Sequence, residues 1–155
     1  IQAAITSEEA YIDLQQQIIA KVDDVETEVD RLNDLYQDED PDEPNFCTTT
    51  FSLPDSLERE REQASSSIAT SEDTLVELES IAAEYASSTS AAERAEAIRP
   101  FLELSSQDEI KNELDVTRLQ LEIDNDFKTQ IEEFNTELQQ DINRCDRNVD
   151  NGGGR

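Results

Sequence analysis

The chain has 155 residues and carries a formal net charge of −27 at pH 7, because 39 acidic residues face only 12 basic ones. This length suits one domain, so we expect residues 1–155 to form a single domain. The charge repels nucleic acid and anionic lipid surfaces, which excludes nucleic-acid binding, and it attracts cations and basic partners. No apolar run reaches the roughly 20 residues that cross a bilayer, so we expect no membrane insertion.

The cysteines and the absent residue types indicate where in or outside the cell the protein is expected. His, Trp and Met are absent and the chain begins at Ile1, so we expect it to be cut from a precursor. Cys47 and Cys145 are compatible with one disulfide in an oxidising compartment. We therefore expect a secreted protein, or one in the lumen of a secretory organelle. Two free thiols in a cytosolic protein are the alternative.

The first predicted helix spans residues 6–37. Its apolar residues recur at spacings of seven, or of alternating three and four, which is typical of a heptad seam with Gln15 in one polar core position. A second stripe of Ile5, Ile12 and Ile19 predicts that this helix touches two neighbours. This periodicity argues against the disorder that low aromatic content and high charge would otherwise indicate. The seam residues are Tyr11, Ile18, Val22, Val25, Val29, Leu32 and Tyr36.

An acidic connection is expected over residues 37–54, where two prolines and repelling charges forbid a helix. Its alternate carboxylates resemble the start of a calcium-binding loop. However, the sixth position is Glu43 where the turn needs glycine, and the twelfth is Thr49 where a bidentate carboxylate is required. We expect either a solvated run of charge or weak, collective cation binding, with Ca²⁺ as the candidate ion. The acidic residues concerned are Asp38, Glu39, Asp40, Asp42 and Glu43.

The same connection ends in the β-prone segment 46–51, which is apolar enough to be pinned against the helices through Cys47. A second helix is predicted over residues 55–86. It opens at Asp55, and Glu58 can complete a capping box there. Its heptad seam is small and rich in serine: Ala64, Ile68, Ser71, Leu75, Leu78, Ala82 and Tyr85.

A short helix is predicted over residues 90–104. Ser90 and Glu93 form a capping box at its start, and Pro100 is expected to kink or end it. The segment therefore serves as an elbow between two long helices.

The last predicted helix spans residues 106–148 and opens with a further capping signature, Ser106 and Glu109. Its apolar residues repeat every eleven positions, so we expect it to be nearly straight or slightly right-handed in its wrapping. Residues 149–155 contain three consecutive glycines and are expected to form a flexible tail. The repeating positions are Val116, Phe127, Leu138 and Val149, then Ile123, Phe134 and Cys145, then Ile131 and Ile142.

The predicted fold class is all-α: an elongated antiparallel helical bundle or coiled coil of three long helices plus one short helix. If the chain runs up, down and up again, Cys47 and Cys145 reach the same end. A disulfide would then close a loop of about a hundred residues, worth about 4–5 kcal/mol in the chain-entropy model. A bridge between subunits is the competing interpretation.

Catalysis finds little support in the sequence. There is no histidine to activate either cysteine, and there is no glycine-rich phosphate loop. Paired carboxylates need a concave site that holds one pKa high, and narrow helical packing offers little concavity. We expect a protein that is not an enzyme and has no cofactor apart from weakly bound Ca²⁺.

The heptads from Val22 to Tyr36 and from Ala64 to Tyr85, the acidity, the absence of Met and the sparse cysteines resemble one known family. These are the mature trichocyst matrix or granule lattice proteins of ciliates, small acidic helical proteins cut from precursors and packed into secretory granules. The resemblance covers residues 6–147 and rests on no diagnostic motif. It implies a calcium-responsive, lattice-forming structural protein without an active site.

We therefore expect a structural, self-assembling subunit of an extracellular or secretory-organelle lattice, filament or shell. Its partners would be copies of itself or related helical proteins, because the double apolar stripe exceeds what one thin bundle covers. Packing copies at this charge requires screening, so assembly should depend on cations. The alternative is a secreted acidic helical binding module, an adaptor or adhesin that recognises a basic protein.

Overall fold

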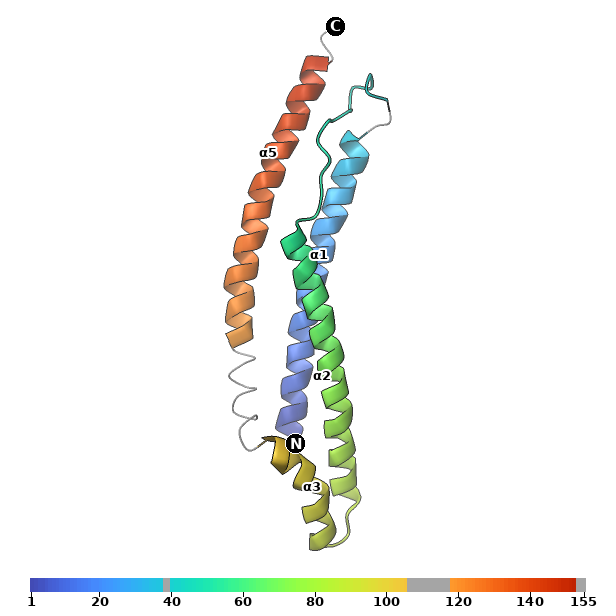
Figure 1. Ribbon diagram of the computed structural model, residues 1–155, viewed down its shortest axis with the longest axis vertical. Helices are drawn as coiled ribbons and strands as arrows, with labels where there is room; N and C mark the ends of the chain where they lie inside the picture. Colours follow the sequence, from blue (N-terminus) through green and yellow to red (C-terminus); the bar gives the residue numbers. More distant parts are fainter. Residues whose placement is uncertain (38–39, 106–117, 153–155) are drawn as a thin grey trace.

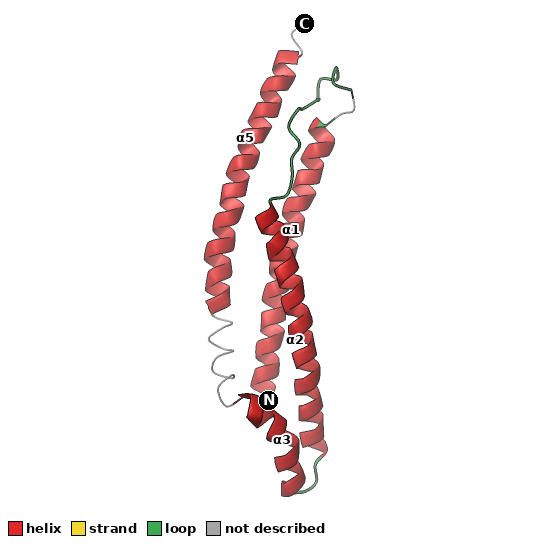
Figure 2. Ribbon diagram, in the orientation of Figure 1, coloured by secondary structure: helices red, strands yellow, loops and turns green. Residues whose placement is uncertain are grey.

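The computed structural model describes residues 1–37, 40–105 and 118–152. Within these ranges every regular element is a helix, so the predicted all-α class is confirmed. The elements are α1 (Gln2–Tyr36), α2 (Asp55–Ser87), α3 (Ala91–Ser105), a helical stretch over 118–122, the π-helical turn η1 (Ile123–Phe127) and α5 (Lys128–Gly152) (Figure 2).

The helices are staggered along one long axis (Figure 1). α1 packs against α2, which runs in the opposite direction, and α2 packs against α3. α2 reaches beyond the start of α1, and α3 turns back beside the end of α2. α5 lies along the C-terminal half of α1 and runs in the same direction as α1 (Figure 1). The molecule is therefore elongated, and different helices form its two ends.

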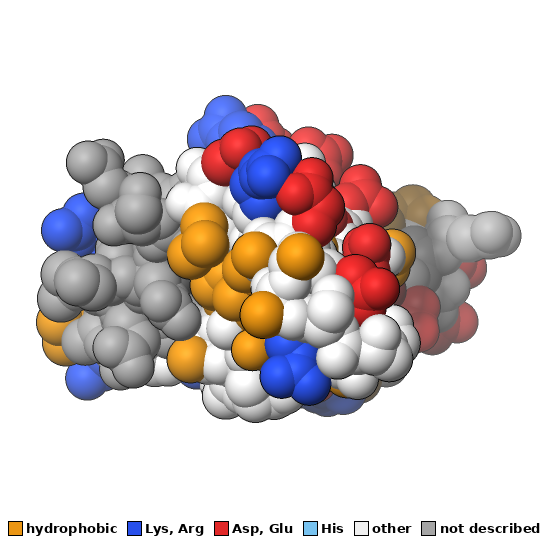
Figure 3. Space-filling model, turned by 90° about the horizontal axis from the view of Figure 1, so that it is seen from below, with side chains coloured by type: hydrophobic (Ala, Val, Ile, Leu, Met, Phe, Trp, Pro, Cys, Tyr) orange, Lys and Arg blue, Asp and Glu red, His pale blue; other side chains and the backbone are white. Residues whose placement is uncertain are grey.

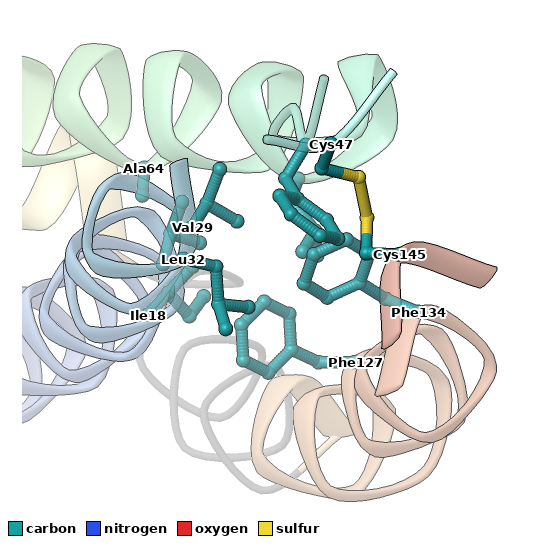
Figure 4. Close-up of a cluster of buried hydrophobic side chains, with 11 residues drawn as sticks. Ile18, Val29, Leu32, Cys47, Ala64, Phe127, Phe134 and Cys145 are labelled. Atoms are coloured by element: carbon teal, nitrogen blue, oxygen red, sulfur yellow. A yellow bond between two sulfur atoms is a disulfide. The ribbon is translucent and has the colours of Figure 1, made fainter. Parts of the chain in front are cut away.

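Two clusters of buried side chains hold the helices together. The central cluster, shown in Figure 4, joins α1, the connecting segment before α2, the start of α2, and the end of η1 with α5. The α3 cluster joins the start of α1, the end of α2 and α3. The central cluster consists of Ile18, Val22, Val29, Leu32, Cys47, Phe51, Leu57, Ala64, Phe127, Phe134 and Cys145. The α3 cluster consists of Ala4, Ile5, Leu78, Ile81 and Phe101.

The predicted heptad seam of α1 supplies much of this buried surface. Val22, Val29 and Leu32 are all buried in the central cluster. Of the second stripe, Ile5 is buried in the α3 cluster and Ile19 is partly buried against the central one. α1 therefore contacts more than one neighbour, as expected. Because α2 and α3 cover Ile5 within the same chain, that part of the stripe is not an uncovered apolar edge.

The start of α1 and the cap of α2 differ from the prediction. α1 starts at Gln2, four residues before the predicted position 6, and the Ile5 N–H donates to the carbonyl of Ile1 at 3.0 Å. α2 does start at Asp55, but no side chain caps it. The extended Pro54 is the N-cap, and its carbonyl accepts bonds from the N–H groups of residues 57 and 58 at 3.0 and 3.1 Å. The predicted capping box of Asp55 and Glu58 is therefore wrong.

The capping box at α3 is confirmed. The Glu93 carboxylate accepts hydrogen bonds from the N–H groups of Thr89 and Ser90 at 2.8 and 3.1 Å, and the Ser90 hydroxyl accepts one from the Glu93 N–H at 3.2 Å. These bonds lower the pKa of Glu93, because they stabilise its charged form; those from Thr89 have the largest effect. α3 then continues through Pro100 to Ser105, so the proline does not end the helix.

The predicted eleven-residue stripe faces the central cluster from Ile123 to Cys145. Phe127, Phe134 and Cys145 are buried in it, and four further stripe residues pack against it: Ile123, Ile131, Leu138 and Ile142. The expected capping signature of Ser106 and Glu109 and the stripe residue Val116 lie outside the described residues. α5 extends to Gly152, so residues 149–152 belong to the helix and not to a flexible tail.

The π turn η1 interrupts what was expected to be a regular helix, and the spacing of apolar residues explains it. Leu119, Ile123, Phe127 and Ile131 follow one another at intervals of four. In a regular α-helix each such step overshoots one face by about 40°. A π turn holds one extra residue, so it cancels part of this rotation and returns the following apolar side chains to the same face. Phe127 is therefore buried while Ile123 and Ile131 still contact the same cluster.

Candidate functional site

The acidic connection does not gather its carboxylates into one site. Asp40, Asp42 and Glu43 are exposed in a turn, where the Asp40 carboxylate accepts a bond from the Asp42 N–H at 3.0 Å. Asp38 and Glu39 lie outside the described residues. Among the residues that are described, no three Asp, Glu or Cys side chains lie close enough to hold one metal ion. Collective cation binding by this loop stays a prediction.

The cysteines lie at the same end of the molecule. Cys47 and Cys145 are joined in a disulfide with their Cα atoms 5.2 Å apart and a sequence separation of 98. Both side chains are fully buried in the central cluster. The pairing therefore lies within one chain and ties the connecting segment to α5.

Amide side chains of α1 hold the connecting segment in place. The Asn33 carboxamide donates to the Phe51 carbonyl at 2.8 Å and accepts from the Phe51 N–H at 2.9 Å. One turn further on, the Gln37 amide donates to the Thr49 carbonyl. From α5, Asn148 donates to the Thr48 hydroxyl at 3.2 Å. Sequence reasoning predicted that this segment is pinned, but it did not identify the amides: Asn33 lies in the last turn of α1, and Gln37 is its extended C-cap.

Tyr36 links α1, the connecting segment and α5. Its ring lies 5.9 Å from the ring of Phe51, and its hydroxyl donates to the Asp146 carboxylate at 2.7 Å. This hydrogen bond is the main reason why the pKa of Tyr36 is raised, since a phenol that donates to a carboxylate is stabilised in its neutral form.

One arginine of α2 binds the acidic surface of α1. The Arg61 guanidinium forms ion pairs with Glu26 and, at 3.1 Å, with Asp23. The bond to Glu26 contributes most to raising the pKa of Arg61, followed by the bond to Asp23. Next to this arginine in the sequence, Glu60 accepts a bond from Gln130 of α5 at 3.4 Å. α2 is therefore connected by polar bonds to both α1 and α5.

The strongest candidate for a binding site is a cavity of about 230 Å³ between α1, α2 and the π turn. Three carboxylates line it: Glu60 is half-buried, and Glu122 and Asp126 are exposed. Sequence reasoning missed all three, because they come from helices that only the fold brings together. The other lining residues are apolar (Ile18, Ala64, Leu119, Ile123 and Phe127) or neutral and polar (Tyr11, Gln15, Gln63 and Ser67).

Gln15 is the polar core residue that the heptad pattern singled out, and it lines this cavity. It is only 4% exposed. No hydrogen bond among the described residues involves its side chain. Lys21 stands near the same place, with its ammonium 5.9 Å from the centre of the Phe127 ring. The cavity therefore combines negative charge, apolar surface and an amide that forms no hydrogen bond to a described residue.

No model of a known protein family matches the chain, and no curated protein or solved structure shows significant similarity to it. Within the described part of the chain, no helix has both the length and the hydropathy needed to span a membrane. The fold and the site define an elongated, acidic, all-helical protein with a disulfide in its core and a carboxylate-lined cavity at a π turn.

Proposed function

We propose that this protein is a non-enzymatic structural subunit that assembles with copies of itself, or with related helical chains, in a cation-dependent manner. The observation that carries the proposal is apolar surface left open at one end of the molecule. Figure 3 views that end and displays hydrophobic side chains gathered there. Of the two helices at this end, α2 carries Tyr85 near its own end, which is 41% exposed, and α3 carries Leu102 near its C-terminus, which is 55% exposed.

The staggered helices suit end-to-end contact. α2 and α3 form one end, whereas α5 and the connection that follows α1 form the other (Figure 1). A contact between unlike ends is heterologous, so it repeats from copy to copy and builds a filament or, with further contacts, a lattice. In this proposal the heptad seams of α1 and α2 form a coiled coil that stiffens each subunit.

Charge makes the proposed assembly conditional. With 39 acidic and 12 basic residues, one-to-one pairing leaves at least 27 carboxylates without a basic partner in the chain. Bringing copies together concentrates this charge, so cations must screen it. The proposed setting is a secretory organelle or the extracellular space, as the resemblance to granule lattice proteins implies. Ca²⁺ is the candidate ion there, bound weakly and collectively.

The test compares apolar residues at this end with an apolar residue elsewhere. Leu102→Ser combined with Tyr85→Ser should weaken self-association about tenfold, because two exposed anchors of the contact are lost. Val76→Ser is the matched control, since Val76 is 67% exposed on α2. It should leave association unchanged. Sedimentation velocity at rising protein concentration measures both.

Two results would contradict the proposal. Equal effects of the end variant and the Val76 control would mean that association is unspecific. A strict monomer at high concentration in every salt would instead favour the monomeric binding module with a basic protein partner.

A further inference from the structure

We propose that the cavity between α1, α2 and the π turn binds a primary alkylammonium group, with the ammonium at the carboxylates and the alkyl stem on the apolar lining. The inference does not depend on the proposed assembly. It rests on the residues around the cavity, and a single subunit already contains all of them.

The polar lining fits an ammonium donor. An ammonium carries three N–H donors and no acceptor. Glu60 of α2, and Glu122 and Asp126 at the π turn, line the cavity with carboxylate acceptors. No three described carboxylates lie close enough to hold one ion, so an ammonium would be bound by one or two of them. Glu60 is held at the cavity by the bond that it accepts from Gln130. Hydrogen bonds between an ammonium and carboxylates are short and about twice as strong as neutral ones.

Gln15 provides a second, independent indication of a ligand. The side-chain amide of a nearly buried residue usually has a hydrogen-bond partner. Gln15 is 4% exposed, and it lines the cavity without a hydrogen bond to any described residue. Its amide atoms are accessible from the cavity, since Oε1 of Gln130 is the fully buried side-chain atom without a partner among the described residues. A donor placed in the cavity would satisfy its carbonyl oxygen.

The size and the apolar lining favour an organic cation over a bare ion. The volume of about 230 Å³ is many times what one water molecule or one ion needs. Ile18, Ala64 and Phe127 offer the alkyl stem an apolar surface. Lys21 beside Phe127 offsets part of the negative charge, which leaves a net attraction for one further cation from the three carboxylates.

The alkylammonium has two potential sources, a free amine or the lysine side chain of another protein. The experiment separates them on the full chain. Butylammonium chloride is titrated in one arm and a short peptide with a single lysine in the other, in about 150 mM NaCl to screen long-range attraction. Nuclear magnetic resonance follows the side-chain amide of Gln15. Either probe should saturate at one site and shift this amide, and the probe that does so identifies the source.

Matched variants test the site. Glu60→Gln should weaken binding about tenfold, since it removes a charge-assisted bond. Glu62→Gln makes the same change at an exposed position two residues along α2 and should leave affinity unchanged. Gln15→Leu should abolish binding, because it removes the one neutral amide that lines the nearly buried wall of the cavity and replaces it by an apolar group of similar size.

Several outcomes overturn the proposal. Equal losses in the Glu60 and Glu62 variants would indicate general attraction to an acidic surface. Wild-type affinity in the Gln15→Leu variant, with the fold confirmed by circular dichroism, would place the ligand elsewhere. Failure of both probes to saturate would leave the cavity as a packing defect. Displacement of butylammonium by CaCl₂ with the same shift of the Gln15 amide would make it a metal site.

Discussion

The Asn33 side chain pairs with the backbone of the extended connecting segment, as a neighbouring strand would in a sheet. The connecting segment before α2 is extended and has no neighbouring strand among the described residues. Its backbone groups still need partners, because an unpaired buried N–H or C=O is costly. The carboxamide of Asn33 offers one donor and one acceptor side by side, and it satisfies both groups of Phe51. Phe51 can therefore be buried beside Cys47 in the central cluster.

Replacing Asn33 by Ala should lower the free energy of unfolding by about 2–4 kcal/mol, because both Phe51 backbone groups lose their partner. Asn135→Ala is the control, since Asn135 is exposed on α5. That change should be neutral or slightly stabilising, because Ala favours the helix. Urea unfolding followed by circular dichroism measures both variants. An Asn33 variant as stable as the control would mean that packing alone holds the segment.

Tyr36 should make stability depend on alkaline pH. Its pKa in the folded protein is raised, mainly by donation to Asp146. The unfolded chain therefore loses this proton first, at its ordinary pKa of about 10. Stability from this bond is complete below pH 10 and is lost as pH rises through the folded pKa. Tyr36→Phe should flatten the decline of the unfolding free energy between about pH 9.5 and 11.

Tyr85→Phe is the matched control for this pH profile. Tyr85 is also a partly exposed tyrosine on a long helix, but no hydrogen bond of its hydroxyl to a described residue occurs. This control should keep the wild-type slope. Identical slopes for the wild type and the Tyr36 variant would show that the bond to Asp146 does not persist in solution.

At the scale of the elements, the helices could be predicted because their signals are local. The seam of α1, the stripe of α5 and the capping box at Ser90 and Glu93 all follow from side chains one to three turns apart. The capping box predicted at Asp55 is wrong because Pro54, and not Asp55, is the N-cap of α2. The Pro54 carbonyl accepts the first hydrogen bonds of the helix, so Asp55 already lies inside it. A sequence motif alone does not show at which residue the backbone turns from extended to helical, and that residue is the N-cap.

The π turn and the cavity beside it were not predicted, since both depend on how helices meet. The intervals of four from Leu119 to Ile131 are visible in the sequence. However, the eleven-residue repeat describes the mean spacing over three turns, and this mean is that of a regular helix. Gln15 was recognised as polar and central, but Glu60 and Asp126 became its neighbours only when α2 and η1 packed against α1. Residues far apart in the chain without a shared motif give no joint signal.

The disulfide should matter most for how the elements hold together, since it ties α5 to the connecting segment. Replacing Cys47 and Cys145 by Ala should lower the free energy of unfolding by about 4–5 kcal/mol, because a loop of nearly a hundred residues is no longer closed in the unfolded chain. Far-ultraviolet circular dichroism during urea unfolding measures this. A loss below about 1 kcal/mol would show that the central cluster alone fixes α5.

At the scale of the whole molecule, shape and charge have opposite effects on the proposed association of copies. The staggered helices leave unlike ends, one of which carries open apolar surface. The net charge of −27 keeps copies apart in dilute salt. A Debye length of about 30 Å at 0.01 M ionic strength, against about 8 Å at 0.15 M, is long enough for this repulsion to act across the narrow molecule. In the proposed assembly, cations would therefore control whether the apolar end of one copy can meet the unlike end of the next.

Sedimentation velocity of the unmodified chain during cation titration tests this account most directly. NaCl, MgCl₂ and CaCl₂ are compared at equal ionic strength and fixed protein concentration, and the melting temperature is followed in parallel. We predict a monomer at about 10 mM ionic strength and progressively larger species as cations are added, with divalent ions acting at lower concentration than Na⁺. Unchanged size and unchanged melting temperature across all three titrations would contradict cation-controlled assembly.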